Sequence, residues 1–149
     1  MKDIMELCNI VRETSYAIHQ YHRQRHLEKV YENALAHRLR KAGLDVKQQH
    51  PLKVYDEDGT EIGEYYADLV IENCLIVELK ASKAFAPEHK AQLIGYLRAS
   101  NIEHGLLVNF GSYKFQIKKY ALSSPATSIT QKLSLLLLPL SALSAFFRG

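Results

Sequence analysis

The stretch Leu75-Ile76-Val77-Glu78-Leu79-Lys80 decides the fold. It is apolar, as a buried strand is, and the side chains of a strand point alternately to the two faces of its sheet. Glu78 and Lys80 therefore project side by side from one face. Charged side chains are costly to bury unless they are paired or bound to a metal ion. The pair is thus either a salt bridge on an edge strand or part of a functional site.

The strand expected before it favours a functional site. Residues 66–71 place one carboxylate, Asp68, in an apolar run, and a short turn leads on to Leu75. An antiparallel hairpin would bring Asp68 opposite Glu78 and Lys80. Carboxylate oxygens suit Mg²⁺, with Mn²⁺ as an alternative, and an ammonium group can orient water or stabilise charge on a phosphate. The three side chains predict a metal-dependent phosphodiesterase centre, with Asp68 and Glu78 as metal ligands.

The rest of the chain supplies a domain around these two strands. Gly43 fits the end of a helix and Pro87 the first turn of another. The first three strands should form an antiparallel meander in an α/β (α+β) fold, with a mixed central sheet flanked by helices in the order α-α-β-β-β-α-β-β. The periodicity predicts helices over residues 2–21, 27–42 and 87–99, and strands over 46–55, 61–71, 75–81, 105–109 and 115–120.

Two of the expected helices add candidate site residues. Gln92 and Tyr96 are spaced i, i+4 and share one face, where an amide and a phenol can hold a water or a phosphate oxygen. On the second helix, Glu28 lies nearer than Glu32 to the centre of the apolar stripe, so Glu28 is expected to complete the metal site and Glu32 to be more exposed. The alternative for Glu28 is a surface acid favoured by the helix dipole. The stripe is formed by Leu27, Val30, Tyr31, Ala34, Leu35 and Leu39.

Positive charge is concentrated before and along the second helix. The net charge is only +3, but residues 19–41 hold many Lys, Arg and His residues and only two Glu. Such a run is ordinarily a solvated face, and its functional reading is a polyphosphate partner, DNA or RNA. His19, His22 and His26 could instead face a transition metal, although no carboxylate or cysteine completes that set locally. The predicted nucleic-acid contacts are Arg23, Arg25, Lys29, Arg38 and Lys41.

Length and composition set the outer bounds. A chain of 149 residues, 47% hydrophobic and 23% charged, suits one globular domain, which we place at residues 1–122. Cys8 and Cys74 show no metal-ligand pattern, and no export signal is recognisable, so a reducing, cytoplasmic location is expected. The tail, residues 123–149, is apolar but interrupted by Pro139, and no membrane span is expected. It is predicted to dock on this domain, on a second copy of the chain or on a partner protein.

Five segments match a known pattern in order and spacing. They are LEKVYENAL (27–35), EYYADLVIE (64–72), IVELKA (76–81), HKAQLIGYL (89–97) and GLLVNFG (105–111). In these segments the chain resembles the GxxExxY proteins of the PD-(D/E)xK nuclease superfamily. The resemblance implies a restriction-endonuclease-like core of α-β-β-β-α-β order, a divalent-metal site at Asp68 and Glu78, and Lys80 as catalytic base or charge stabiliser.

The same resemblance bears on the helices. It implies that Glu28 is the helical acid of the motif, and that Gln92 and Tyr96 are the Q-x-x-x-Y element of RecB-like exonucleases. One position departs from the family, because its leading glycine falls at Arg25. A glycine there would allow a close approach of the backbone, whereas this chain adds positive charge.

The main alternative is a non-catalytic module for nucleic-acid binding or protein assembly that kept the nuclease scaffold. Arg25 in place of the glycine and the apolar tail favour this alternative. The full set of acids with Lys80 favours the enzyme, because a purely structural role gives no reason to keep buried charges together.

Overall fold

The structure is a computed structural model that describes residues 2–122, so the tail predicted over residues 123–149 lies outside the described residues. Each predicted helix and strand is confirmed, with ends within two residues of the prediction, and no helix of the described range is long and apolar enough to cross a bilayer. The elements are α1 (Ile4–His22), α2 (Glu28–Lys41), β1 (Val46–Tyr55), β2 (Glu61–Ile71), β3 (Leu75–Lys80), α3 (Pro87–Ser100), β4 (His104–Asn109) and β5 (Gln116–Ala121).

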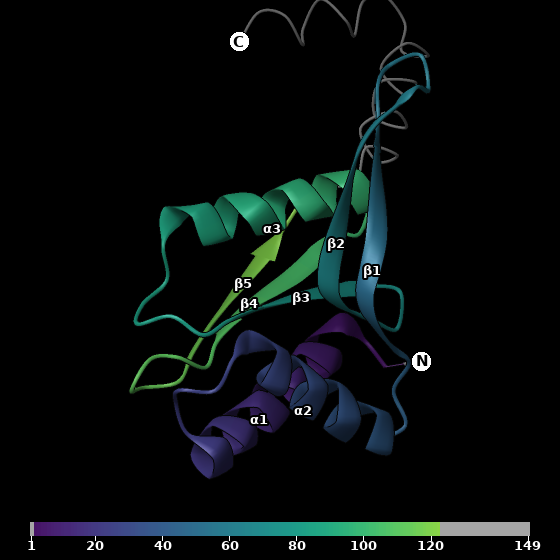
Figure 1. The fold of residues 1–149 in the computed structure, drawn as a ribbon. Coiled ribbons are helices and arrows are strands. Elements are labelled where there is room, and N and C mark those ends of the chain that lie inside the picture. The colour runs from purple at the N-terminus through teal and green to yellow at the C-terminus, as the bar shows by residue number, and fades with distance from the viewer. Residues whose placement is uncertain (1, 123–149) are drawn as a thin grey trace, which may run out of the picture.

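The strands form one sheet in the order β1-β2-β3-β4-β5. The first three strands are antiparallel neighbours, which confirms the predicted meander. β3 and β4 run parallel, and β5 is antiparallel to β4. α1 and α2 cover one face of the sheet, and α3, which connects the parallel pair, covers the other (Figure 1). The fold is therefore the mixed, helix-flanked sheet that the sequence predicts.

The side chains of β3 alternate between the two faces of the sheet, so they pack in two separate core clusters. Leu75, Val77 and Leu79 pack in a cluster with α1 and α2, whereas Ile76 packs in a second cluster with α3. All four side chains are at most 1% exposed, and burial of each contributes roughly 1.5–3 kcal/mol. The two charged side chains of β3 belong to the face of Ile76, so packing of the strand fixes them on the side of α3.

β1 and β2 continue past the sheet as a long two-stranded arm (Figure 1). Their pairing extends, through a register shift after Val54, to Tyr55 and Glu61, and residues 61–66 are exposed. The turn at the tip is acidic, with Gly59 in the left-handed conformation at φ 87°. The arm rises beside the C-terminal half of α3, and β1 contacts that helix.

α2 buries a different stripe from the one predicted. Leu27 is 78% exposed and Val30 is 40% exposed, because the first is only the N-cap and the second lies at the margin of the packed face. These two residues had drawn the predicted centre of the stripe toward Glu28. In the structure Glu28 is exposed and Glu32 is 4% exposed, so the predicted order of burial is wrong. The residues that α2 buries are Tyr31, Glu32, Leu35, Ala36 and Leu39.

The loop between α1 and α2 keeps a glycine-like conformation without glycine. Arg25 has a φ of 81° and Arg23 a φ of 59°, both in the left-handed region. The hydroxyl of Tyr31 donates to the Arg23 carbonyl at 2.5 Å and accepts from the N–H of His26 at 3.2 Å, which closes the loop. A left-handed conformation costs an L-residue about 1–2 kcal/mol. The loop therefore keeps a backbone conformation that suits glycine, although arginine at these positions adopts it at a steric cost.

Candidate active site

The site is built where the strands β2 and β3 stop pairing. Their register runs from Ile71 and Leu75 to the pair Leu69 and Val77 and ends there. Beyond that pair, backbone N–H groups of the two strands donate to the carboxylates of the two acids and not to the carbonyl groups of the neighbouring strand. The N–H of Asp68 donates to Oε1 of Glu78 at 2.8 Å, and the N–H of Leu79 donates to Oδ2 of Asp68 at 2.9 Å.

These two bonds bring the predicted acids together. Asp68 and Glu78 lie against each other on adjacent strands, as the hairpin argument requires. Glu78 is 2% exposed, and its pKa is raised from 4.5 to about 9. Burial is the main cause and the charge of Asp68 the second, while Lys80 partly opposes them. At neutral pH without a cation, Glu78 is accordingly protonated.

The acid pair fits a divalent cation. A buried carboxylate next to a second carboxylate is unfavourable as an anion pair, and a hard cation would relieve that repulsion. No three His, Cys, Asp or Glu side chains within residues 2–122 are close enough to hold an ion together. Mg²⁺ is commonly bound through one or two carboxylates with water and phosphate oxygens completing its shell, so Asp68 and Glu78 satisfy its minimum.

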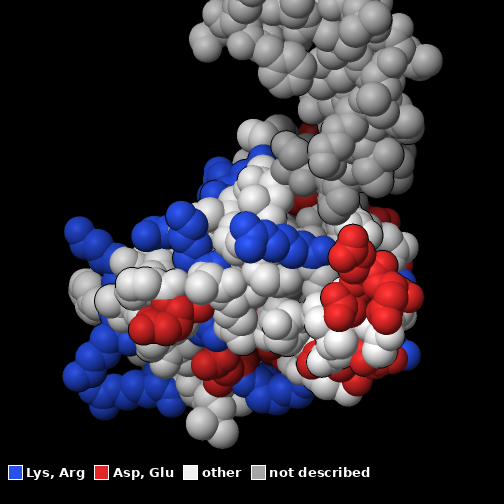
Figure 2. All heavy atoms as spheres, turned by 90° about the horizontal axis from the view of Figure 1, so that it is seen from above, with Lys and Arg blue, Asp and Glu red and all other residues white. Residues whose placement is uncertain are grey.

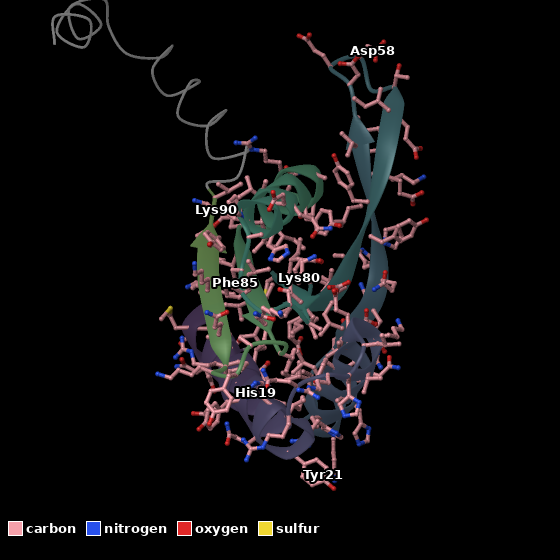
Figure 3. All side chains as sticks on the ribbon, turned by 60° about the vertical axis from the view of Figure 1, so that its left-hand side comes forward. His19, Tyr21, Asp58, Lys80, Phe85 and Lys90 are labelled. Carbon is pink, nitrogen blue, oxygen red and sulfur yellow. The ribbon has the colours of Figure 1, made fainter. Side chains whose placement is uncertain are left out.

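Lys80 lies at the start of a chain of polar contacts into α3. Its Nζ donates to Oε1 of Gln92 at 2.7 Å, and Nε2 of Gln92 donates to the hydroxyl of Tyr96 at 2.8 Å. Tyr96 is 7% exposed, and burial, followed by the charge of Glu78, raises its pKa. The structure thus brings together all three of these predicted residues. Figure 3 shows Lys80 between α3 and the arm, far from Asp58 at the arm's tip.

Glu32 is the helical acid that reaches this site. Its Oε1 accepts from Nε2 of Gln49 at 2.5 Å, and the same nitrogen donates to Oδ1 of Asp68 at 3.1 Å. Lys29 and Gln48 donate to its Oε2, each at 2.7 Å. The exposed Glu28 has none of these contacts. Against the prediction, the acid of α2 that lies beside Asp68 is thus Glu32 and not Glu28, because α2 is rotated relative to its apolar pattern.

Gln49 is a site residue that the sequence analysis missed. The flanking pairs His50 with Ala67 and Gln48 with Leu69 place it opposite Asp68 in the β1–β2 ladder. Its φ is 49°, a left-handed value within a strand, which costs on the order of 1–3 kcal/mol. In this conformation the side-chain amide of Gln49 donates both to Glu32 of α2 and to Asp68 of β2. Proline at position 51, inside the predicted strand, was the one local sign of irregularity.

The five predicted nucleic-acid contacts fall into two groups. Arg23, Arg25 and Lys29 lie in the loop before α2 and in its first turn, and all three are exposed. Arg38 and Lys41 lie in the last turn of α2. Twelve residues separate Lys29 from Lys41, about 18 Å along the helix. Within the first group, Lys29 is tied to the acids of the site, since its Nζ donates to Oε2 of Glu32.

The histidines considered as metal ligands do not share a helix face. His19 is buried in α1, where its Nε2 donates to the carbonyl oxygen of Ser112 at 2.9 Å. α1 ends at His22, and His26 lies in the loop beyond it. The geometry gives no support to a transition-metal site at these positions.

Comparisons with known proteins agree with this architecture. A sequence model of the PD-(D/E)XK nuclease superfamily matches residues 5–120, the range that holds every predicted catalytic residue. The fold is similar to the crystal structure of SSO0001, with a TM-score of 0.51 and 19% sequence identity over 69% of this chain and 54% of that one. The chain thus spans about half the length of that protein, and the likeness concerns the fold alone. No curated protein matches significantly.

Proposed function

The chain belongs to the PD-(D/E)XK nuclease superfamily, and from this premise we propose that it is a Mg²⁺-dependent nuclease that hydrolyses phosphodiester bonds of DNA or RNA. The observation that carries the proposal is the junction of β2 and β3. There two carboxylates, one of them almost fully buried, meet beside a lysine. A nuclease that uses a hard cation needs this combination of groups.

The metal in this proposal is held by Asp68 and Glu78, with Mn²⁺ able to replace Mg²⁺. Glu32 supports Asp68 through the amide of Gln49, so it takes the part that the sequence assigned to Glu28. When bound, the ion supplies positive charge for the scissile phosphate and makes a nearby water more acidic.

Lys80 is the residue proposed to position the attacking water or to stabilise charge that develops on the phosphate. Gln92 holds the lysine ammonium through its carbonyl oxygen, and Tyr96 fixes the orientation of that amide by accepting its N–H. This arrangement keeps the ammonium on the same side of the sheet as the acids. Gln92 and Tyr96 then orient the water or the phosphate through Lys80.

The basic residues of the α1–α2 loop are proposed to grip the nucleic-acid backbone without reading its sequence. Lys29 bonds to Glu32 at the site, Arg23 and Arg25 lie in the loop before it, and Arg38 and Lys41 would extend the track along α2.

The proposal includes three narrower assignments. The first is to the GxxExxY proteins within the superfamily. The second is a cytoplasmic location, which is supported by two free cysteines, Cys8 and Cys74. The third is association with a second copy or a partner protein through residues 123–149.

An inactive nucleic-acid-binding module is the second candidate. Gln49 favours it, because its amide already donates to both Glu32 and Asp68 and so satisfies part of the site without a cation. Such a module would bind the same polyphosphate backbone through the basic loop.

Cleavage assays separate the two candidates. Labelled single- and double-stranded DNA and RNA are incubated with the protein in Mg²⁺, in Mn²⁺ and in EDTA. Metal-dependent cleavage is expected, and Lys80→Ala should lower it by about 10²-fold or more while binding and thermal stability are kept. Lys47→Ala, at an exposed lysine whose Nζ donates to Asn73 in the turn between β2 and β3, is the matched control. If the wild type binds nucleic acid but leaves every substrate intact, the module is the correct assignment.

A further inference from the structure

A cleft runs from the candidate active site between α3 and the arm. Its outer part, about 450 Å³, is lined by Lys53, Tyr55 and Tyr65 of the arm and by Gly95 and Arg98 of α3, among others. An inner part of about 170 Å³ lies over residues 91–96 of α3, and Tyr65 and Gly95 line both parts. The inner part includes Gln92 and Tyr96, the two residues bonded to each other beside Lys80. The two parts therefore form one path that begins at the site.

The lining of this path suits an anion with aromatic groups. Among the described residues that line it there is no Asp or Glu, whereas Lys53 and the exposed Arg98 supply positive charge. Lys53 is 51% exposed although it also pairs with Glu61 at 3.4 Å. Viewed from above, the largest group of acidic side chains lies on the side of the arm, and Lys and Arg side chains lie over the rest of that face together with smaller acidic groups (Figure 2).

Aromatic rings stand along the same path. Tyr55 is 58% exposed and Tyr65 is 44% exposed, and the ring of Tyr65 lies against Tyr96 with centroids 5.4 Å apart. Exposed tyrosine rings beside basic side chains are the usual means of holding unpaired bases by stacking. From Gln92 to Arg98 the helix rises about 9 Å, so bases leaving the site would pass Tyr65 before they reach Arg98.

Gly95 shows that the path is kept open. A glycine in the interior of a helix is unfavourable relative to alanine, so its presence calls for a reason. A Cβ placed on Gly95 meets no atom within 4 Å among residues 2–122 apart from its chain neighbours and the adjoining backbone of its own helix, so close packing is not that reason. The missing side chain leaves space on the floor of the cleft, where the inner and outer parts meet.

We propose that this cleft holds a single-stranded segment of the nucleic-acid substrate next to the scissile phosphate, with Gly95 as its floor, Tyr65 as a stacking platform and Arg98 as a phosphate contact. The inference rests on the proposed nuclease function and narrows its substrate to unpaired strands.

The test measures binding and cleavage separately on the full chain. Fluorescence anisotropy in EDTA follows a labelled single-stranded oligonucleotide and a duplex of the same sequence, and cleavage is followed in Mg²⁺. Gly95→Leu fills the floor, and we expect it to weaken single-strand binding about tenfold without lowering the melting temperature, with Gly95→Ala in between. Arg98→Gln should weaken binding about threefold, whereas Arg12→Gln, an exposed arginine of α1, should bind as the wild type does.

The outcomes decide the two claims independently. Equal single-strand affinity of Gly95→Leu and the wild type, or of Arg98→Gln and Arg12→Gln, overturns the cleft assignment, and the second pair decides even if Gly95→Leu fails to fold. A duplex bound as tightly as the single strand also overturns it. Single-strand binding that depends on Gly95 in a protein that cleaves nothing keeps the cleft and removes the nuclease. Cleavage that Gly95→Leu leaves unchanged keeps the nuclease and removes the cleft.

Discussion

The main-chain N–H of Asp68 donates to Oε1 of Glu78 at 2.8 Å, at the point where β2 and β3 stop pairing. A reciprocal bond from the next backbone N–H of β3 reaches the carboxylate of Asp68. Each acid thus holds the strand of the other. Protonation of Glu78, binding of the proposed cation and the integrity of the sheet would therefore be coupled at one place in the molecule.

The metal-free protein should lose stability as the pH rises from about 5 to about 9. The pKa of Glu78 is raised from 4.5 to about 9 in the folded state. Between these values the folded chain keeps a proton that the unfolded chain has released, so the free energy of unfolding falls with pH. Glu78→Gln should flatten this dependence and exceed the wild type at pH 8 by on the order of 2 kcal/mol. Urea denaturation in EDTA at several pH values measures both, and an unchanged slope in Glu78→Gln would contradict the assignment.

A divalent cation should displace the proton of Glu78. Titration calorimetry with Mg²⁺ or Mn²⁺ at pH 7, in two buffers of different ionisation enthalpy, should show about one proton released per ion. Asp68→Asn should lower the affinity by at least about tenfold, while Asp45→Asn, an exposed acid before β1, should not. Heat signals that are independent of the buffer would show that the ion binds elsewhere.

Glu32 and Glu28 should differ in their effect on cleavage. Glu32→Gln removes the negative charge that holds the amide of Gln49 beside Asp68. A loss of about 10- to 100-fold in activity or metal affinity is therefore expected. Glu28→Gln is the matched control on the same helix, and it should retain wild-type activity because the side chain is exposed. The reverse order of effects would restore the assignment made from the sequence.

Replacing Arg25 by glycine should stabilise the fold. The φ of 81° at this position is strained for arginine and free for glycine, and the relief outweighs the added entropy of the unfolded chain by about 0.5–1 kcal/mol. Arg12→Gly removes the same side chain from the exposed face of a helix and should destabilise by about 1 kcal/mol. Chemical denaturation of both variants measures the difference, and a loss of stability in Arg25→Gly would show that the guanidinium has contacts worth more than the strain.

The pattern of the sequence predicts the strands and most of the site because both follow from short-range geometry. Glu78 and Lys80 share a face by the two-residue period of a strand, and Gln92 meets Tyr96 by the four-residue spacing of a helix. The tight turn before β3 then brings Asp68 opposite them. Each of these relations needs only the element and the connection next to it.

The remaining site residues depend on how elements pack. Glu32 was misplaced because Leu27 and Val30 are apolar but exposed, and only the contact of α2 with the sheet reveals which stripe is buried. Gln49 was missed because its left-handed backbone within a strand is imposed by neighbours from other elements. Neither fact can be read from local periodicity.

The two hydrogen bonds from backbone N–H groups to the carboxylates of Asp68 and Glu78 give these acids a structural role that does not depend on catalysis. A descendant that lost its activity would still need a side-chain oxygen acceptor at each position to close the seam between the two strands, so an Asp or Glu kept there says little about turnover. Lys80 has no such structural role, because its ammonium bonds only to the side chain of Gln92 within residues 2–122. Among related sequences the lysine, rather than the acids, is therefore the better marker of a working enzyme.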